Sequence, residues 1–300
     1  MAHMPIVRVF ALCFALSVAA AAQQIPAALT TDPPVDKDHP AAMESFQIPS
    51  HGAALNAIAY LAPGAGPHPV VIVLHGFPGN EKNLDLAQSI RRAGWNAVFF
   101  DYRGSWGSPG SFSFGNCIED TQAAIAYLRD PANAAKLRTD PKRIALVGHS
   151  MGGFLAAYAG SHDPAILGTV MISAANMGYM PKRAEVAGDP KASLAQLAAA
   201  LVREDILPLA GCTGESLAQE LTDHQKDWNF LGYASLFGNR PLLLITSDDG
   251  LAPFSTALAE AVRKQGSKSV KEAHYSTDHS YSDHRIALQV EVLNWLSILK

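Results

Sequence analysis

Charged residues are scarce in this sequence, and they are not gathered in one region. The 300 residues include 23 Lys and Arg and 27 Asp and Glu, which gives a formal net charge of −4. Without a basic stripe, the chain lacks the electrostatic footprint of a nucleic-acid-binding protein, so we expect no nucleic acid as partner. Hydrophobic residues make up 48% of the chain, which is too apolar for a disordered protein and enough for a sizeable core.

Cysteine is also scarce. Of the three cysteines, Cys13 lies in the N-terminal segment, which leaves Cys117 and Cys212. Two states stay open for this pair, a single disulfide or two buried thiols, because geometry and not spacing decides between them.

Long apolar runs are absent beyond the N-terminus, so we expect no membrane span in the mature chain. The N-terminus itself carries Arg8, an apolar stretch over 9–19 and the small residues 20–22, which fit an A-x-A cleavage site. A membrane anchor would need roughly 20 apolar residues in a row, and this run is shorter. We therefore expect residues 1–22 to be a secretory signal and the protein to be secreted or periplasmic.

Residues 23–40 are rich in Pro, Ala, Thr and Asp without periodicity, which predicts a flexible leader. From residue 41 to residue 300, strand-like runs alternate with helix-like ones. The strand-like runs lie at 70–74, 97–101, 144–147, 169–172, 242–246 and 270–274. This rhythm predicts an α/β fold with a doubly wound, mostly parallel central sheet. Two earlier segments, 44–48 and 54–62, are expected as antiparallel edge strands.

The rhythm stops between residues 176 and 239, where the sequence becomes helical and rich in Ala and Leu. Asp189 and Pro190 mark the start of a helix, and a second helix is expected over 215–225. We interpret this stretch as a helical cap inserted into the domain. It would lie over the carboxyl edge of the sheet, where open α/β sheets bind their ligands.

The strongest motif is Gly148-His-Ser150-Met-Gly152-Gly, which follows a strand-like run and opens a helix. This is the context of a nucleophile elbow, in which glycines permit a sharp reversal from strand to helix. The bend points Ser150 off the sheet at a helix N-terminus, where free backbone N–H groups stabilise developing negative charge. A glycine-rich packing turn would not explain the serine, so Ser150 is the predicted nucleophile.

A serine hydroxyl needs a base, and in this chain order an acid comes between the serine and the histidine. His279 follows a strand-like run and precedes the terminal helix, so it is the predicted base. His274 and His284 are weaker alternatives, because the first falls in the strand and the second at the start of the helix. His75 and His149 precede the acid and suit structural roles.

The acid should follow the penultimate strand, where the sequence offers Asp248 and Asp249. Successive side chains in an extended stretch point opposite ways, so only one of them can face His279. We predict Asp249, beside the turn residue Gly250. The oxyanion of the tetrahedral intermediate needs two donors, and we predict the backbone N–H groups of Met151 and Phe77.

Five motifs in order resemble the α/β-hydrolase superfamily from about residue 70 to the C-terminus. They are HGFPG (75–79), DYRGSWGSPG (101–110), GHSMGG (148–153), SDDGLAP (247–253) and DHSYSD (278–283). The second and the last resemble dienelactone-hydrolase-type esterases and relatives of the prolyl-oligopeptidase group. His149 before the serine is more typical of esterases and lipases, and there is no room for the propeller of those peptidases. Haloalkane dehalogenases and epoxide hydrolases of this fold use aspartate at the elbow, so Ser150 argues against both.

The leading hypothesis is a serine hydrolase that cleaves small-molecule carboxylic esters through an acyl-enzyme, without metal or organic cofactor. A peptidase or amidase would use the same triad, and a non-catalytic binding protein is a third reading, since fold alone does not guarantee activity. The expected pocket residues, in addition to Phe77, are Trp106 from a core loop and Tyr179, Met180 and Trp228 from the cap. Packing of the cap onto the core is the alternative role for these side chains.

Overall fold

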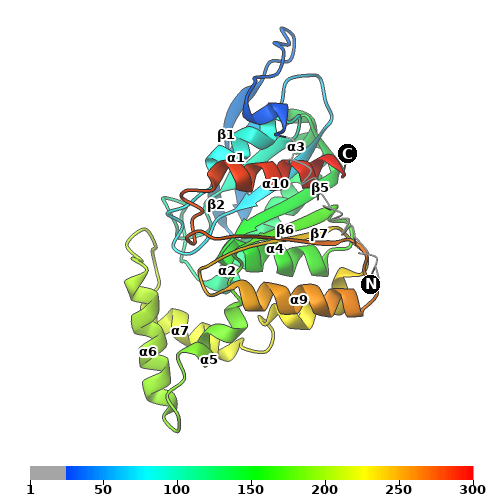
Figure 1. The fold of residues 1–300 in the computed structure, drawn as a ribbon. Helices are drawn as coiled ribbons and strands as arrows, with labels where there is room; N and C mark the ends of the chain where they lie inside the picture. Colours follow the sequence, from blue (N-terminus) through cyan, green and yellow to red (C-terminus); the bar gives the residue numbers. More distant parts are fainter. Residues whose placement is uncertain (1–24, 300) are drawn as a thin grey trace, which may run out of the picture.

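The computed structural model describes residues 25–299, and the predicted signal segment lies outside them. Its centre is one eight-stranded sheet in the order β1-β2-β4-β3-β5-β6-β7-β8 (Figure 1). The strands are β1 (Ala42–Ser50), β2 (Ala53–Leu61), β3 (His68–Leu74), β4 (Asn96–Phe100), β5 (Thr139–His149), β6 (Gly168–Ile172), β7 (Leu242–Ser247) and β8 (Val270–Tyr275). Strands β3 to β8 are parallel, whereas β2 is antiparallel to both β1 and β4. The predicted fold class, including the two antiparallel edge strands, is confirmed.

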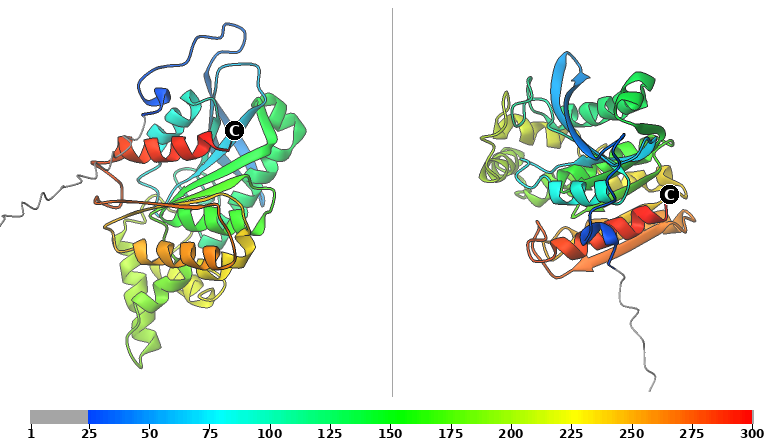
Figure 2. Two further views of the ribbon diagram at one scale, coloured as in Figure 1. Left: turned by 45° about the vertical axis from the view of Figure 1, so that its right-hand side comes forward. Right: turned by 90° about the horizontal axis from the view of Figure 1, so that it is seen from above.

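Helices cover both faces of the sheet (Figures 1 and 2). On one face lie α1 (Leu84–Arg92) and α10 (Arg285–Ser297), and on the other lie α2 (Phe114–Arg129), α4 (Met151–His162) and α9 (Ala252–Lys264). Alternate residues of one strand serve the two layers: Val71 and Val73 pack toward α1 and α10, whereas Val70 and Ile72 pack toward the opposite helices. A short helix, α3 (Pro131–Lys136), follows α2. No helix within residues 25–299 is long and apolar enough to cross a membrane.

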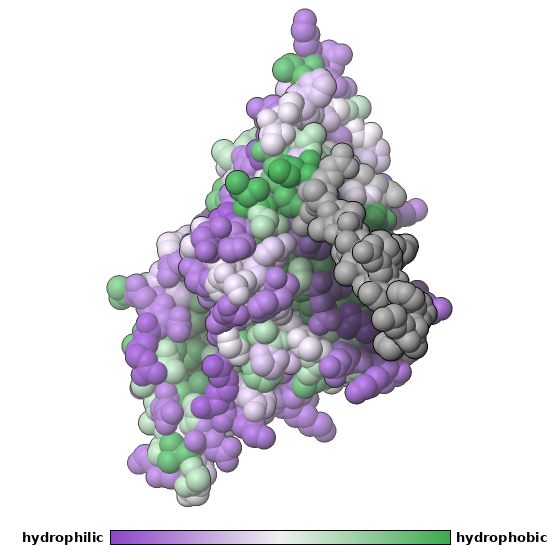
Figure 3. Space-filling view, viewed as in Figure 1, coloured by the Kyte–Doolittle hydropathy of each residue, from purple (hydrophilic) through white to green (hydrophobic). Residues whose placement is uncertain are grey.

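The predicted cap is a group of short helices between β6 and β7, which stands out from the body in Figure 1. It comprises η2 (Met177–Tyr179), α5 (Met180–Arg183), α6 (Pro190–Arg203), α7 (Gly214–Asp223), η3 (Phe230–Tyr233) and α8 (Ala234–Phe237). Asp189 caps α6, because its Oδ1 accepts from the N–H of Ala192 at 2.9 Å. The face shown in Figure 3 is mostly hydrophilic with smaller apolar patches.

Part of the segment predicted as a flexible leader is packed against the domain. Ala27–Leu29 form a 3-10 turn, η1, that contacts α1 and α10. Ala28 is buried, and its carbonyl accepts a hydrogen bond from Arg92 Nε. A turn of three residues is too short to produce periodicity in the sequence, so only the tertiary contacts reveal it.

Both cysteines of the described chain are free thiols. Cys117 is fully buried in α2, and Cys212 is half-buried in the cap. Burial raises the pKa of both thiols, most strongly that of Cys117. Of the two states left open by the sequence, the structure has the unbridged pair.

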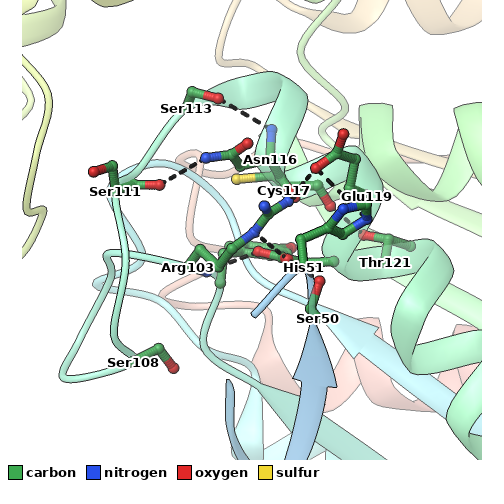
Figure 4. A network of polar contacts seen from close by, with 12 residues as sticks. Ser50, His51, Arg103, Ser108, Ser111, Ser113, Asn116, Cys117, Glu119 and Thr121 are labelled. Atoms are coloured by element: carbon green, nitrogen blue, oxygen red, sulfur yellow. Dashed lines mark hydrogen bonds and ion pairs between the residues drawn. The ribbon is translucent and has the colours of Figure 1, made fainter. Parts of the chain in front are cut away.

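A buried polar network fixes the loop that leaves β4 (Figure 4). The side chain of Asp120 on α2 is fully buried and accepts from Ser50 Oγ at 2.6 Å, from the N–H of Arg103 at 2.7 Å and from Arg103 Nε at 2.6 Å. Burial raises the pKa of Asp120, and the hydrogen bonds from Ser50 and Arg103 oppose that rise. The network therefore ties β1, α2 and the loop after β4 together.

The same loop joins the cap to the body through backbone hydrogen bonds. Gly104 O accepts from the N–H of Ala210 at 2.7 Å, and the N–H of Phe112 donates to Ala210 O at 2.8 Å. The N–H of Trp106 donates to Pro208 O at 3.1 Å. This edge of the cap is thus held by the main chain and does not depend on particular side chains.

We expect Asp120→Ala to lower the free energy of unfolding by about 3–5 kcal/mol, because Arg103 would stay buried without its main partner. Urea denaturation measures this loss. Glu119→Gln is the matched control: Glu119 also bonds Arg103 but is 43% exposed, so its loss should cost under about 1 kcal/mol. Equal effects of the two substitutions would contradict a structural role for the buried pair.

Candidate active site

Ser150 lies at the reversal from β5 to α4, and steric crowding dictates its surroundings. A Cβ at Gly148 would lie 1.9 Å from Gly152 O, and a Cβ at Gly152 would lie 2.0 Å from Leu74 O, so only glycine fits at either position. Ser150 itself has φ of 59° and ψ of −119°, a strained conformation for a residue with a side chain. The bend is held by a hydrogen bond of 2.9 Å from the N–H of Ser150 to Ile172 O.

His279 and Asp249 form a close pair at the ends of two neighbouring strands. His279 lies in the loop after β8, and its Nδ1 is 2.7 Å from Asp249 Oδ2 in the loop after β7. The Asp249 side chain is only 6% exposed, and its Oδ1 also accepts from the N–H of Leu251 at 2.8 Å. Burial alone would raise the pKa of Asp249, but the hydrogen bonds from His279 and Leu251 prevail and lower it to about 2.

Asp248 lies elsewhere. Its Oδ1 is 3.1 Å from His274 Nε2, and both side chains are more than half exposed. Of the two neighbouring aspartates, Asp249 is therefore the one that the structure places against His279. Since an ionised Asp249 accepts a hydrogen bond, Nδ1 of His279 carries the proton and Nε2 is left with a free lone pair.

One cavity of about 360 Å³ brings the predicted catalytic residues together. Ser150, His279 and Asp249 all line it, as do Phe77 and Met151, whose N–H groups are the predicted oxyanion donors. The other lining residues come mainly from the cap and from loops at the carboxyl edge of the sheet, and most of them are apolar. They are Phe114, Ala175, Asn176, Met177, Met180, Arg183, Ala200, Leu201, Glu204, Leu251 and Phe254.

The predicted pocket residues divide between this cavity and other places. Met180 lines the cavity, but Trp106, Tyr179 and Trp228 do not. Tyr179 packs on Phe254 with ring centroids 4.7 Å apart, and Trp228 is buried in an aromatic cluster between cap and core. Trp106 contacts the loop 75–79 instead. For Tyr179 and Trp228 the placement matches the alternative interpretation, packing of the cap.

The two predicted oxyanion donors flank Ser150. Met151 is the first residue of α4, so its N–H has no acceptor within the helix and lies at the positive end of the helix dipole. The peptide before Phe77 passes very close to the serine, because a Cβ at Gly76 would lie 2.9 Å from Ser150 Cβ and 3.4 Å from Ser150 Oγ. The loop could not approach the nucleophile this closely with any other residue at position 76.

Two features hold His279 in place, and sequence reasoning assigned neither in detail. His149 donates Nε2–H to His279 O at 2.8 Å, with ring centroids 4.7 Å apart. Burial, reinforced by the nearby His279, lowers the pKa of His149 to about 3, so His149 stays neutral beside the second imidazole. Ser173 Oγ also lies 3.0 Å from both Ser247 Oγ and Tyr281 OH, which links the end of β7 to the loop of His279. The sequence signal for the two serines is their position just beyond predicted strands, which Tyr281 does not share.

No group of three or more His, Cys, Asp or Glu in the described part of the chain is arranged to hold a metal ion.

Sequence comparison places the chain among known proteins. A model described as the Alpha/beta hydrolase family matches residues 71–288. Protein YfhR of Escherichia coli K12 is 33% identical over 113 residues, which cover 37% of this chain and 34% of YfhR. Protein Rv2307c of Mycobacterium tuberculosis H37Rv is 34% identical over 92 residues, covering 30% of this chain and 31% of Rv2307c. These alignments thus span about a third of each relative.

Solved structures share the fold over most of the chain. The Pyrococcus furiosus esterase Pf2001 matches with a TM-score of 0.61 and 18% identity, covering 89% of this chain and 99% of the esterase. The carboxylesterase EstE1, from a metagenomic library, gives 0.61 at 22% identity, with coverages of 87% and 91%. The acylaminoacyl peptidase of Pyrococcus horikoshii gives 0.60 at 16% identity, covering 86% of this chain but 41% of the peptidase. At such identities the likeness concerns the fold.

The contact between Asp249 and His279 predicts a specific dependence of stability on pH. The folded pKa of Asp249, about 2, lies below its ordinary value of 3.8, so the carboxylate stabilises the fold above about pH 4. That contribution, roughly 1–2 kcal/mol after allowance for solvent screening, is lost as the pH falls from about 4 to about 2. Urea denaturation over this range should show a smaller acid loss for Asp249→Asn than for the natural chain. Asp248→Asn should leave the acid loss unchanged, and the reverse outcome would show that the pairing is wrong.

Proposed function

The chain belongs to the alpha/beta hydrolase family, and on this premise we propose that it is a hydrolase, and specifically a serine esterase acting through an acyl-enzyme. The observation that carries the proposal is the common cavity of Ser150, His279 and Asp249, with the close contact between the last two. The order serine, acid, histidine along the chain is that of this fold's hydrolases. The esterase fold of the structural neighbours agrees with the proposal.

In the proposed acylation step, Ser150 Oγ attacks the ester carbonyl while His279 Nε2 takes the hydroxyl proton. Asp249 keeps the proton of His279 on Nδ1 and stabilises the imidazolium that forms. The negative oxygen of the tetrahedral intermediate accepts from the N–H groups of Met151 and Phe77. His279 then protonates the departing alkoxide, and the acyl group remains on Ser150.

Deacylation repeats these steps with water as nucleophile. His279 takes a proton from the water as it attacks the acyl carbon, and Ser150 Oγ leaves with that proton as the acid is released. The low pKa of Asp249 keeps it ionised across the neutral range, so it can accept the hydrogen bond from His279 Nδ1 throughout that range.

The cavity favours an apolar acyl group of small to medium size. Its volume of about 360 Å³ lies near the lower end of the range for small-molecule sites. One wall of the cavity lies outside the core strands and includes Met177, Met180 and Phe254. The flexible side chain of methionine can adapt its shape to the ligand. We therefore propose aliphatic or simple aryl esters as the substrate class.

Labelling with a fluorophosphonate probe and turnover of a nitrophenyl acyl ester test the proposal. We expect the natural chain to be labelled and to turn over, and Ser150→Ala to lose labelling and nearly all turnover. The remaining rate should be about 10³-fold over water, because the oxyanion donors are still present. Near-normal turnover by purified, folded Ser150→Ala protein would exclude the mechanism. Faster cleavage of an aminoacyl anilide than of the ester would assign the same site to a peptidase or amidase.

The cavity lining predicts where acyl specificity is determined. We expect Met180→Ala to enlarge the pocket and to raise the preference for long over short acyl esters, measured as a ratio of kcat/KM, by about tenfold. The control is Leu207→Ala, since Leu207 belongs to the cap but is 89% exposed. An unchanged ratio in Met180→Ala, or an equal change in the control, would show that another surface selects the acyl chain.

A further inference from the structure

The loop 75–79 is held by two aromatic ring N–H groups, each of which binds a backbone carbonyl of the loop. His75 Nδ1 is 2.8 Å from Gly76 O, and Trp106 Nε1 donates to Pro78 O at 2.8 Å. The two rings flank Gly79, where a Cβ would lie 2.6 Å from His75 Nδ1 and 2.7 Å from Trp106 Nε1. The first attachment is on the peptide that carries the N–H of Phe77, and the second is two residues further along the chain.

The surroundings of His75 determine which nitrogen carries its proton. The ring is fully buried, and this burial, more than any neighbour, lowers the pKa of His75 to about 3, so the imidazole is neutral. A carbonyl can only accept, so the contact with Gly76 O requires the proton on Nδ1. Nε2 has no hydrogen-bond partner and lies 3.7 Å from Asp101 Oδ1, too far for a bond.

This hydrogen bond sets the direction of the predicted oxyanion donor. Gly76 C=O and the N–H of Phe77 belong to one planar trans peptide, in which the two groups point in opposite directions. Any rotation that tilts the N–H of Phe77 must also move Gly76 O away from His75. His75 therefore resists rotation of the peptide that lies beside Ser150.

Trp106 holds the other end of the loop and is itself held by two contacts. Lys82 Nζ lies 4.4 Å from the centre of the Trp106 ring and forms an ion pair of 2.8 Å with Asp101. The main-chain N–H of Trp106 donates to Pro208 O in the cap. The indole N–H is thus delivered to Pro78 O by a side chain that the core and the cap both position.

We propose that His75 and Trp106 are positioning residues, which aim the N–H of Phe77 at the oxyanion of the substrate. The inference rests on the proposed esterase function and deepens it, since neither ring needs to touch the substrate. Trp106, expected from the sequence to line the pocket, would act through Pro78 and the loop instead.

The test compares an aryl ester with its thionoester, in which sulfur replaces the carbonyl oxygen. Sulfur is a weak hydrogen-bond acceptor, so a well-aimed oxyanion donor speeds the ester far more than the thionoester. Loss of one such donor lowers kcat by about 10²–10³, and a donor that is only misdirected should cost less, about tenfold. We therefore expect the kcat ratio of ester to thionoester to fall about tenfold in the variants, with KM for the ester within about twofold.

Trp106→Phe is the principal variant, because it removes the indole N–H and keeps an aromatic ring at a site that is 37% exposed. At position 75, His75→Asn places an amide N–H where Nδ1 lies and should retain most of the ratio. His75→Gln places its amide near Nε2 and should not. The control is Trp95→Phe. Trp95 directly precedes β4, at the amino ends of the parallel strands and opposite the carboxyl ends where Ser150 lies, and its Nε1 has no hydrogen-bond partner. Stability should therefore fall without a change in the ratio.

The possible outcomes distinguish failure of this inference from failure of the proposed function. If the natural chain hydrolyses the ester but Trp106→Phe and His75→Gln leave the ratio unchanged, or slow both substrates equally, the inference is overturned and the proposed function stands. If the natural chain shows neither turnover nor labelling of Ser150, the proposed function fails. Nitrogen-15 NMR of the imidazoles tests the hydrogen bond itself, without any substrate. A His75 ring that carries its proton on Nε2, or that titrates between about pH 5 and about pH 8, would overturn the inference in either case.

Discussion

The rest of the site depends on steric crowding at one point, where β3, β5 and α4 meet around Ser150. Backbone atoms would lie about 2 Å from a Cβ at Gly148 or Gly152, so the strand and the helix approach as closely as two main chains can. At this reversal Ser150 adopts a positive φ, and the bend turns its side chain off the sheet. With the serine fixed by the backbone, the other groups need only be brought to it by the ends of neighbouring strands. The parallel sheet does this, because β3, β7 and β8 all end at the same edge as β5.

Two neutral, buried imidazoles hold loops at this carboxyl edge of the sheet. His75 and His149 are both buried, and burial lowers the pKa of each to about 3, so neither carries a positive charge. Each donates one N–H to a backbone carbonyl, His75 to Gly76 and His149 to His279. A lysine or arginine could donate as well, but it would bring a buried positive charge. Neutral donors hold the two loops without adding charge to the site.

The sequence predicts the parts of this molecule that local pattern determines. Apolar runs marked five of the six parallel strands, and the glycines around Ser150 marked the elbow, because burial on both faces and steric crowding each restrict residue type directly. The exception is β8, whose sequence VKEAHY is mixed and which is partly exposed. Alternation of side chains allowed only one of Asp248 and Asp249 to face His279, and the turn residue Gly250 favoured Asp249. The contacts of Trp106, Tyr179 and Trp228 did not follow, since an aromatic residue suits a pocket, a packing cluster and a hydrogen bond to a loop equally well. Only the tertiary arrangement separates these roles, as it also does for the packed turn at Ala27–Leu29.

The two walls of the cavity are built in different ways, and this bears on how the site can change. The catalytic wall consists of strand ends and loops fixed by main-chain contacts, such as those of Ser150 with Ile172 and Ala175. The outer wall includes Leu201 on α6, a helix that packs mainly on α5 and α7 within the cap. Because one edge of the cap joins the body through main-chain pairing at 208–210, side chains on α6 can change without disturbing that attachment. Substitutions there would alter the shape of the cavity while Ser150, Asp249 and His279 keep their relative positions, so substrate preference and catalytic geometry can vary independently.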